Sequence, residues 1–273
     1  MSFLRITMLL GTLTGILLVI GFLLGGPVGT TLALLLAIII NFISYWFSDR
    51  IVLRMYGAKP LDDKGMDEMV AKLAHEAKVP KPRLYVVQSD VPNAFATGRN
   101  PQRSAVAVTT GIMKLDKDEM EGVIAHEISH IKNRDILISA MAAAIGGAIA
   151  YIAQIGYWAS MSGDRRDKGG GLSLLLIVIF APMAALLIRL AISRSEEYHA
   201  DRTAALITKN PGGLASALRK ISSHVSEHPM KHGSTATSHM WIVNPFRGDW
   251  FTGMFSTHPP IEKRIERLEE MHM

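Results

Sequence analysis

The stretch that decides the fold is HEISH at residues 126–130, which reads His126-Glu127-Ile128-Ser129-His130. Two histidines four residues apart on a helix project from the same face, so both imidazoles can reach one metal ion. Glu127 projects beside that face, where it can contact a water molecule without being a ligand. The spacing therefore predicts a helix with two metal ligands, His126 and His130, and a general base, Glu127.

A second polar stretch, SRSEEYHAD at residues 193–201, supplies candidates for a third ligand. A catalytic zinc takes three protein ligands and keeps a fourth position open. We expect Glu197 to be the third ligand, and Asp201, one turn later, to hydrogen-bond the free ring nitrogen of a ligand histidine. Glu196 competes with Glu197, because only the helix register separates them, whereas His199 faces away. One Zn²⁺ per chain is predicted.

Another histidine pair, in HVSEH at residues 224–228, fits the inverted zinc-binding pattern H-x-x-E-H. Pro229 follows at once and ends any helix there, and no helix with a third ligand comes after it. We therefore expect this segment not to bind metal. His232 and His239, in the same polar loop, are expected to be exposed.

Charged residues are distributed unevenly along the 273-residue chain. The segments 6–48, 136–163 and 169–188 contain no Asp, Glu, Lys or Arg, and about 20 apolar residues suffice to cross a bilayer as a helix. The pattern predicts four transmembrane helices, at 6–24, 28–47, 136–160 and 172–192. The first two form a hairpin through Gly25-Gly26-Pro27. The second pair could instead be buried helices of a soluble domain.

Basic residues flank the hairpin and predict its orientation. Arg5 precedes it, and Arg50, Arg54 and Lys59 follow it, and short loops rich in Lys and Arg stay in the cytoplasm. We expect a multi-pass protein of the cytoplasmic (inner) membrane whose catalytic domain faces the cytoplasm. These loops account for the formal net charge of +5, so no nucleic-acid partner is predicted.

The remaining segments read as a soluble domain that contains both helices and strands. Apolar spacing predicts helices over 64–79, 203–221 and 259–271 and strands over 84–88 and 105–109. Residues 93–100 read as turns, and 222–257 as a mobile loop.

The helix that carries His126 begins at a capping box formed by Asp116 and Glu119. We expect it to continue without a break into 136–163. The predicted domains are a transmembrane hairpin, the first part of a cytosolic metallopeptidase domain, a second transmembrane pair and the second part of the cytosolic domain, over 1–50, 51–135, 136–192 and 193–273.

Hydrolysis of a peptide bond also requires a group that stabilises the tetrahedral oxyanion. His258, in STHPP at 256–260, is one candidate, and Arg194 and Arg202 are others. Alternatively, His258 is structural and caps the helix that begins near Pro260. The sequence has no cysteine, which excludes disulfides, zinc fingers and thiol catalysis.

Taken together, the chain resembles the HtpX family of membrane zinc metallopeptidases, which is related to the CAAX prenyl endopeptidases. The resemblance is carried by the hairpin and by HEISHIKNRD at 126–135, SRSEEYHAD at 193–201 and STHPPIEKRIERL at 256–268. PNAFATG at 92–98 also resembles the family's substrate groove. The resemblance implies a mainly α-helical membrane protein with an α+β, zincin-like catalytic domain and a small sheet.

The same resemblance implies an endopeptidase that hydrolyses misfolded or damaged membrane proteins, in protein quality control and the stress response. It assigns His126, His130 and Glu197 to zinc and Glu127 to the general base. The family's edge strand would be Ala105–Thr109, with an extended substrate along Ala105, Val106, Ala107 and Val108 and with Asn93 near the groove.

Two alternatives stay open at this point, namely a narrow-specificity prenyl-type peptidase and a non-enzymatic membrane scaffold with a structural metal site. A structural zinc site usually has four protein ligands, whereas this sequence offers three convincing ones, and Glu127 has no use in a closed site. The predicted partners are membrane-protein or unfolded polypeptide substrates and the lipid bilayer, and no oligomeric state is predicted.

Overall fold

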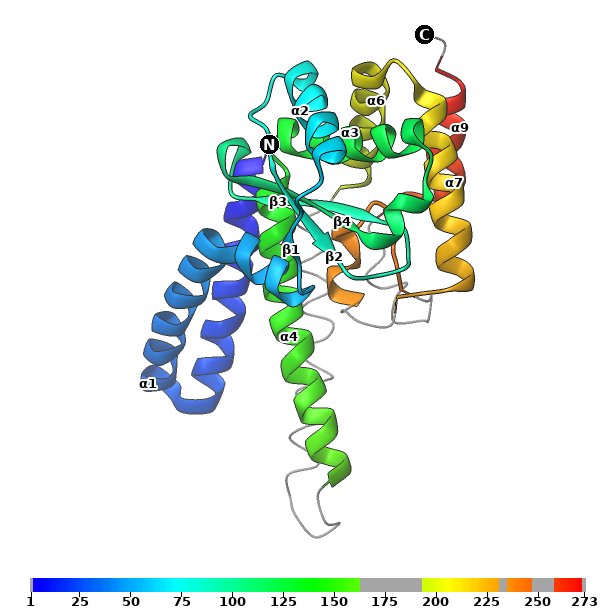
Figure 1. Ribbon diagram of the computed structural model, residues 1–273. Coiled ribbons are helices and arrows are strands. Elements are labelled where there is room, and N and C mark those ends of the chain that lie inside the picture. The colour runs from blue at the N-terminus through cyan, green and yellow to red at the C-terminus, as the bar shows by residue number, and fades with distance from the viewer. Residues whose placement is uncertain (1, 163–192, 231–234, 247–257, 272–273) are drawn as a thin grey trace.

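The computed structural model describes residues 2–162, 193–230, 235–246 and 258–271 (Figure 1). The helices are α1 (Ser2–Met55), α2 (Lys64–Ala77), α3 (Lys117–Asn133), α4 (Ile136–Ser162), α6 (Arg194–Thr208), α7 (Pro211–Glu227) and α9 (Ile261–Glu269). The strands are β1 (Lys59–Pro60), β2 (Arg83–Val87), β3 (Ala94–Gly98) and β4 (Ser104–Thr109). Short 3-10 helices are η1 (Pro101–Arg103), η2 (Thr110–Lys114) and η3 (Thr235–Met240).

Helix α1 is a hairpin of two helical arms, as the sequence predicts (Figure 1). Gly25 and Gly26 have non-helical backbone angles, and Gly26 has a φ of 57°, which glycine adopts without steric cost. The arms Leu4–Leu23 and Gly25–Met55 are both long and apolar enough to cross a membrane. The second arm therefore extends beyond the predicted end at residue 47.

Helix α4 packs against the first arm of the hairpin. Leu9 and Leu13 are buried against Ile138, Met141 and Ile145 of α4. The apolar part of α4 among the described residues, Ile136–Ile149, is shorter than a membrane span. The predicted fourth span, 172–192, lies outside the described residues, and the described part of the chain contains two candidate spans.

The predicted continuous helix from Asp116 into the apolar run is wrong, because the chain turns between α3 and α4. Arg134 is left-handed, with a φ of 60°, and its N–H donates to the carbonyls of His130 and Ile131. This bond pattern closes a helix at its C-terminus. After Asp135 the chain sets off as α4 in a new direction, crossing α3 at a steep angle (Figure 1).

The four-stranded sheet has the order β1-β2-β4-β3. Strand β4 pairs in parallel with β2 and antiparallel with β3, so residues 105–109 are interior and not an edge strand as predicted. The two edge strands are β1 and β3, and β3 forms from residues predicted to be turns. The order along the chain does not reveal this arrangement, because β4 inserts between two strands that precede it in sequence.

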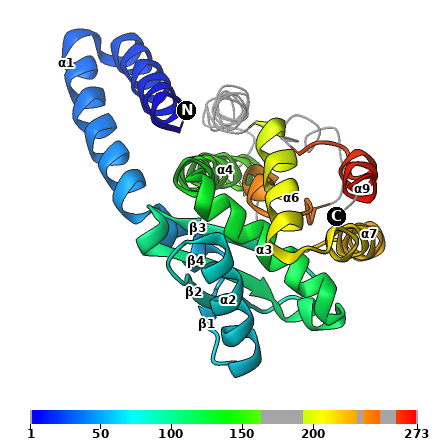
Figure 2. The ribbon, with the colours of Figure 1, turned by 90° about the horizontal axis from the view of Figure 1, so that it is seen from above.

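Helix α3 lies at the centre of the part of the molecule that contains the sheet, where it contacts α2, α6, α7 and β3 (Figure 2). Ile124 and Ile128 are fully buried in the same core as Val106 and Leu214. The predicted capping box starts α3, with the backbone N–H of Asp116 donating to Glu119 Oε2 at 2.9 Å. The predicted helix over 64–79 and strand over 84–88 correspond to α2 and β2.

The C-terminal part contains two departures from the predicted elements. The helix expected over 203–221 is two helices, because Lys209 is left-handed and the Asn210 side chain caps α7 by accepting from the N–H of Gly213. The loop expected over 222–257 contains the end of α7 and, at 237–243, seven consecutive buried residues. Residues 231–234 and 247–257 of that loop lie outside the described residues.

The close approach of α3 and α7 at Gly122 yields a stability prediction. A Cβ on residue 122 would lie 2.8 Å from the backbone N of Leu214, and backbone atoms cannot move aside cheaply. We expect Gly122→Ala to lower the free energy of unfolding by about 1–3 kcal/mol, as overpacking typically does. Thermal unfolding of the purified protein in detergent measures the effect.

Gly65→Ala is the matched control, because Gly65 is also helical and its Cβ would meet its nearest atom, Asp63 Oδ1, at 3.5 Å. Alanine there should stabilise α2 by up to about 1 kcal/mol. Equal unfolding temperatures for Gly122→Ala and the wild type would contradict the α3–α7 contact.

Candidate active site

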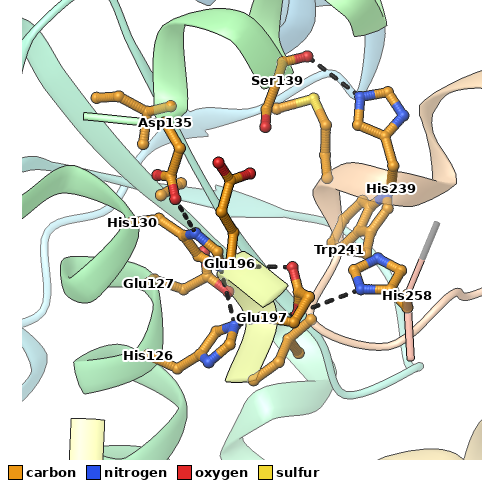
Figure 3. A pocket seen from close by; sticks show the side chains of 14 residues that line it. His126, Glu127, His130, Asp135, Ser139, Glu196, Glu197, His239, Trp241 and His258 are labelled. Atoms are coloured by element: carbon orange, nitrogen blue, oxygen red, sulfur yellow. Dashed lines mark hydrogen bonds and ion pairs between the residues drawn. The ribbon is translucent and has the colours of Figure 1, made fainter. Parts of the chain in front are cut away.

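Three side chains from two helices converge on one point beside the sheet (Figure 3). One ligand atom each from His126, His130 and Glu197 lie within 4.8 Å of one another. The Nε2 atoms of the two histidines are 3.1 Å apart, and each lies 3.7 Å from a Glu197 oxygen. The structure thus brings together the three residues predicted as ligands.

Two aspartates hold the far sides of the histidine rings. His126 Nδ1 lies 2.9 Å from Asp201 Oδ1, in the arrangement predicted for Asp201. His130 Nδ1 lies 3.1 Å from Asp135 Oδ2. With each Nδ1 against a carboxylate, both Nε2 atoms are left to face the shared point.

Asp135 was not predicted as part of this site. Its position depends on the left-handed turn at Arg134, and a prediction of continuous helix would carry Asp135 past His130. The sequence signal is the polar triplet at 133–135, where Asp precedes an apolar helix in the place preferred by an N-cap residue.

The helix register of α6 distinguishes Glu197 from its neighbour Glu196. The Glu197 side chain is buried and faces α3, whereas Glu196 forms an ion pair with Arg5 at the start of α1. Figure 3 shows the Glu196 carboxylate directed away from that of Glu197. His199 is exposed, as expected for a residue that faces away from the site.

Arg264 of α9 supports the site from behind and was not predicted. Its guanidinium is 0% exposed and donates to both Asp201 oxygens at 2.7 and 2.8 Å. It also lies 3.3 Å from Glu197 Oε2. The sequence signal is that Arg264 and Leu268 are four residues apart on α9, so an arginine occupies the buried side of an amphipathic helix.

These buried charges shift one another's pKa values. Burial would raise the pKa of Glu197, but His258 and Arg264 outweigh it and hold that pKa well below its usual range. Burial also opposes ionisation of Asp201, and Arg264 nevertheless keeps its pKa low. Burial would lower the pKa of His130, but the Asp135 carboxylate outweighs it and raises that pKa to about 10.

Glu127 lines the cavity above the three converging side chains. It is buried, and burial raises the pKa of its carboxyl to about 8. The backbone N–H of Ala96, on the edge strand β3, hydrogen-bonds its carboxylate. The carboxylate is therefore fixed between the metal-ligand cluster and the sheet edge.

Of the three candidates for oxyanion stabilisation, the structure brings only His258 to the cluster. Its Nδ1 lies 3.2 Å from Glu197 Oε2, whereas Arg194 and Arg202 are exposed. The alternative role for His258 as a helix cap is not supported, because Pro260 is the N-cap residue of α9 and neither ring nitrogen of His258 makes a hydrogen bond to the described start of that helix.

Four of the five residues predicted to bind substrate lie in an interior strand. Ala105, Val106, Ala107 and Val108 are buried in the interior strand β4. Asn93 is fully buried, and its Nδ2 donates to the carbonyl of Val243 at 2.7 Å. The expectation that 105–108 form an edge strand is therefore wrong. Asn93, expected near the groove, directly precedes the edge strand β3, and Ala96 of β3 lines the cavity.

The remaining histidines divide between the site and the surface. His239, expected to be exposed, is buried, lines the cavity and lies with its Nε2 3.2 Å from the carbonyl of Ser139 (Figure 3). Neither His224 nor His228, at the end of α7, is among the described residues that line this cavity.

Comparison with known proteins identifies the family. Residues 60–272 match the family described as Peptidase family M48. Proteins named Protease HtpX homolog are 52% identical in Pyrococcus furiosus, over 98% of this chain and 96% of that protein, and 46% identical in Persephonella marina, over 99% and 98%. The crystal structure of S. mikatae Ste24p aligns with 98% of this chain and 64% of that chain, at 17% identity and a TM-score of 0.49. The chain therefore belongs to peptidase family M48 and is a membrane metalloprotease.

Proposed function

We propose that this chain is a zinc endopeptidase of the cytoplasmic membrane that hydrolyses misfolded or damaged membrane proteins in quality control. The observation that carries the proposal is the convergence of His126, His130 and Glu197, with Glu127 beside them. The proposed domain division stays as the sequence suggests, with the catalytic domain formed by 51–135 and 193–273 and interrupted by 136–192.

The donor set suits zinc. Two imidazole nitrogens and a carboxylate oxygen are ligands that zinc prefers in catalytic sites, where one further position stays open. Both histidine rings are oriented by carboxylates at Nδ1, which fixes the tautomer that offers Nε2 to a metal. When bound, zinc would polarise the scissile carbonyl and increase the acidity of water.

The chain's own residues supply proton transfer. Glu127 accepts a proton from the attacking water at its carboxylate and then passes that proton to the nitrogen of the leaving amine. The Ala96 N–H holds this carboxylate in place. His258 lines the same cavity and is the proposed donor to the developing oxyanion.

Two features support action on membrane proteins. Arg5, at the start of the first hairpin arm, pairs with Glu196 next to the ligand Glu197, and α4 begins three residues after the end of α3. The ligand His130 is thus six residues before the start of α4, and the ligand Glu197 is adjacent to a residue that contacts the start of α1. A substrate anchored in the bilayer can reach them without complete extraction.

Metal content tests the ligand set. The wild type should bind about one zinc ion per chain, and His126→Ala, His130→Ala and Glu197→Ala should each lose it, because three ligands leave no redundancy. Elemental analysis of the purified proteins measures this. Glu196→Ala is the matched control and should retain zinc; the opposite result for 196 and 197 would show that the α6 register is wrong.

Glu127→Gln tests the catalytic role separately from metal binding. The amide keeps the shape of the side chain but cannot accept the proton, so cleavage of casein or of a membrane-anchored reporter should fall at least about 100-fold. Zinc content and unfolding temperature should stay near wild type. Cleavage at the wild-type rate by Glu127→Gln would refute this mechanism.

Reporter fusions test the topology. The positive residues at both ends of the hairpin predict that a fusion at residue 27 reports the outside and that fusions at 60 and 273 report the cytoplasm. A fusion near 166 should report the outside if 136–192 spans twice. An outside signal at residue 60 would contradict the proposed orientation of the catalytic domain.

A further inference from the structure

The cavity over the metal ligands is too narrow for a polypeptide. Its volume is about 20 Å³, which is the space for roughly one water molecule. Residues from 239 to 242 line it together with Ala96, the metal ligands and Glu127. Cleavage of a peptide bond here therefore requires part of this wall to move.

Residues 239–242 of this wall lie within the buried segment 237–243, which we call the covering segment. All seven residues are buried, and Trp241 is 0% exposed. The backbone N–H of Ile242 donates to the carbonyl of Ala94 at 3.1 Å, and the Asn93 side chain donates to the carbonyl of Val243 at 2.7 Å. The covering segment is thus hydrogen-bonded to the start of β3.

The Ala94 carbonyl belongs to the open edge of the sheet. In an antiparallel pair, successive residues direct their backbone groups alternately toward the partner strand and away from it. The Asn93 carbonyl accepts from Thr109 of β4, so the Ala94 carbonyl faces the side without a strand. Such groups are the ones that an extended peptide pairs with when it adds to a sheet edge.

Contacts with membrane-side helices hold the covering segment in place. Trp241 packs edge-on against Tyr56 and Phe95, with ring centroids 4.9 and 4.8 Å apart, and the Tyr56 hydroxyl contacts Thr237. Tyr56 directly follows α1. On the other side, His239 lies against the Ser139 carbonyl in the first turn of α4. The segment is therefore fastened to the hairpin end and to α4.

From this arrangement we infer that the covering segment is autoinhibitory. In the resting enzyme it occupies the edge of β3 that a polypeptide substrate requires, and it must leave Ala94 before substrate binds. The inference rests on the proposed function, since it assumes that substrates pair with β3. Its contacts with Tyr56 and Ser139 make displacement of the segment sensitive to how the hairpin and α4 sit in the membrane.

A reversible cross-link tests whether the segment must move. The chain has no cysteine, so Ala94→Cys/Ile242→Cys introduces a single pair. Ala94 and Ile242 are joined by one backbone hydrogen bond and belong to one buried cluster, so the pair is the natural choice for a disulfide, which requires Cα atoms roughly 4.4–6.8 Å apart. Mass spectrometry follows the cross-link, and casein cleavage and zinc content are measured before and after reduction.

We expect the oxidised pair to cleave casein at least tenfold more slowly than the same protein after reduction, with unchanged zinc content. The single variants Ala94→Cys and Ile242→Cys should respond to neither oxidant nor reductant. Equal cleavage by the cross-linked and reduced forms would overturn the inference, and so would failure of the pair to cross-link. Cleavage by the wild type tests the proposed function independently.

Hydrogen exchange in the cleavage-deficient Glu127→Gln protein tests the same point without cysteines. Binding of unfolded casein, monitored by co-purification, should increase deuterium uptake in peptides that cover 238–243. Casein binding with unchanged or reduced uptake there would also overturn the inference.

Discussion

The buried pair between Arg264 and Asp201 is the interaction on which the rest of the site depends. Arg264 donates to both Asp201 oxygens and reaches Glu197, so one guanidinium from the last helix fixes both functional carboxylates of α6. Asp201 in turn fixes the His126 ring. Removal of one partner from a buried pair typically costs about 3–5 kcal/mol, so the last turns of the chain are needed for the geometry of the motif at residue 126.

This network leaves an excess of negative charge. Four carboxylates are buried around the cluster, and Arg264 supplies one positive charge to them; they belong to Glu127, Asp135, Glu197 and Asp201. Isolated buried charges are costly, and a divalent cation between the histidines would offset two of the three negative charges that Arg264 leaves uncompensated. Burial is the main cause of the raised pKa of Glu127, whereas the nearby carboxylates, Asp135 first among them, raise the pKa of His130 against the effect of burial.

Local patterns predicted much of the molecule. The i, i+4 spacing of His126 and His130, the register of Glu197 and Asp201 and the hairpin around Gly25-Gly26 follow from helix periodicity and composition, and the structure agrees with each. These features depend on residues close together in sequence. Family resemblance then supplied the activity, and family membership supports it.

The errors concern features that depend on distant residues. The order β1-β2-β4-β3 cannot be read from strand patterns, so the edge was assigned to 105–109 and not to β3. The helix pattern places Arg264 on the buried side of α9, but its partner Asp201 becomes apparent only when α9 is packed against α6. The burial of 237–243 depends on contacts with Tyr56 and Phe95, which are distant in sequence. The composition of the segment alone therefore does not reveal that it is buried.

The central claim is that two histidines and one glutamate hold a single zinc ion, and X-ray absorption at the zinc edge tests it most directly. The account predicts a zinc ion with two imidazoles and a first shell of nitrogen and oxygen at about 2.0–2.2 Å. In His130→Ala the imidazole count of any residual zinc should fall to one. A wild-type protein without zinc, or a zinc spectrum without imidazole scattering, would contradict the account.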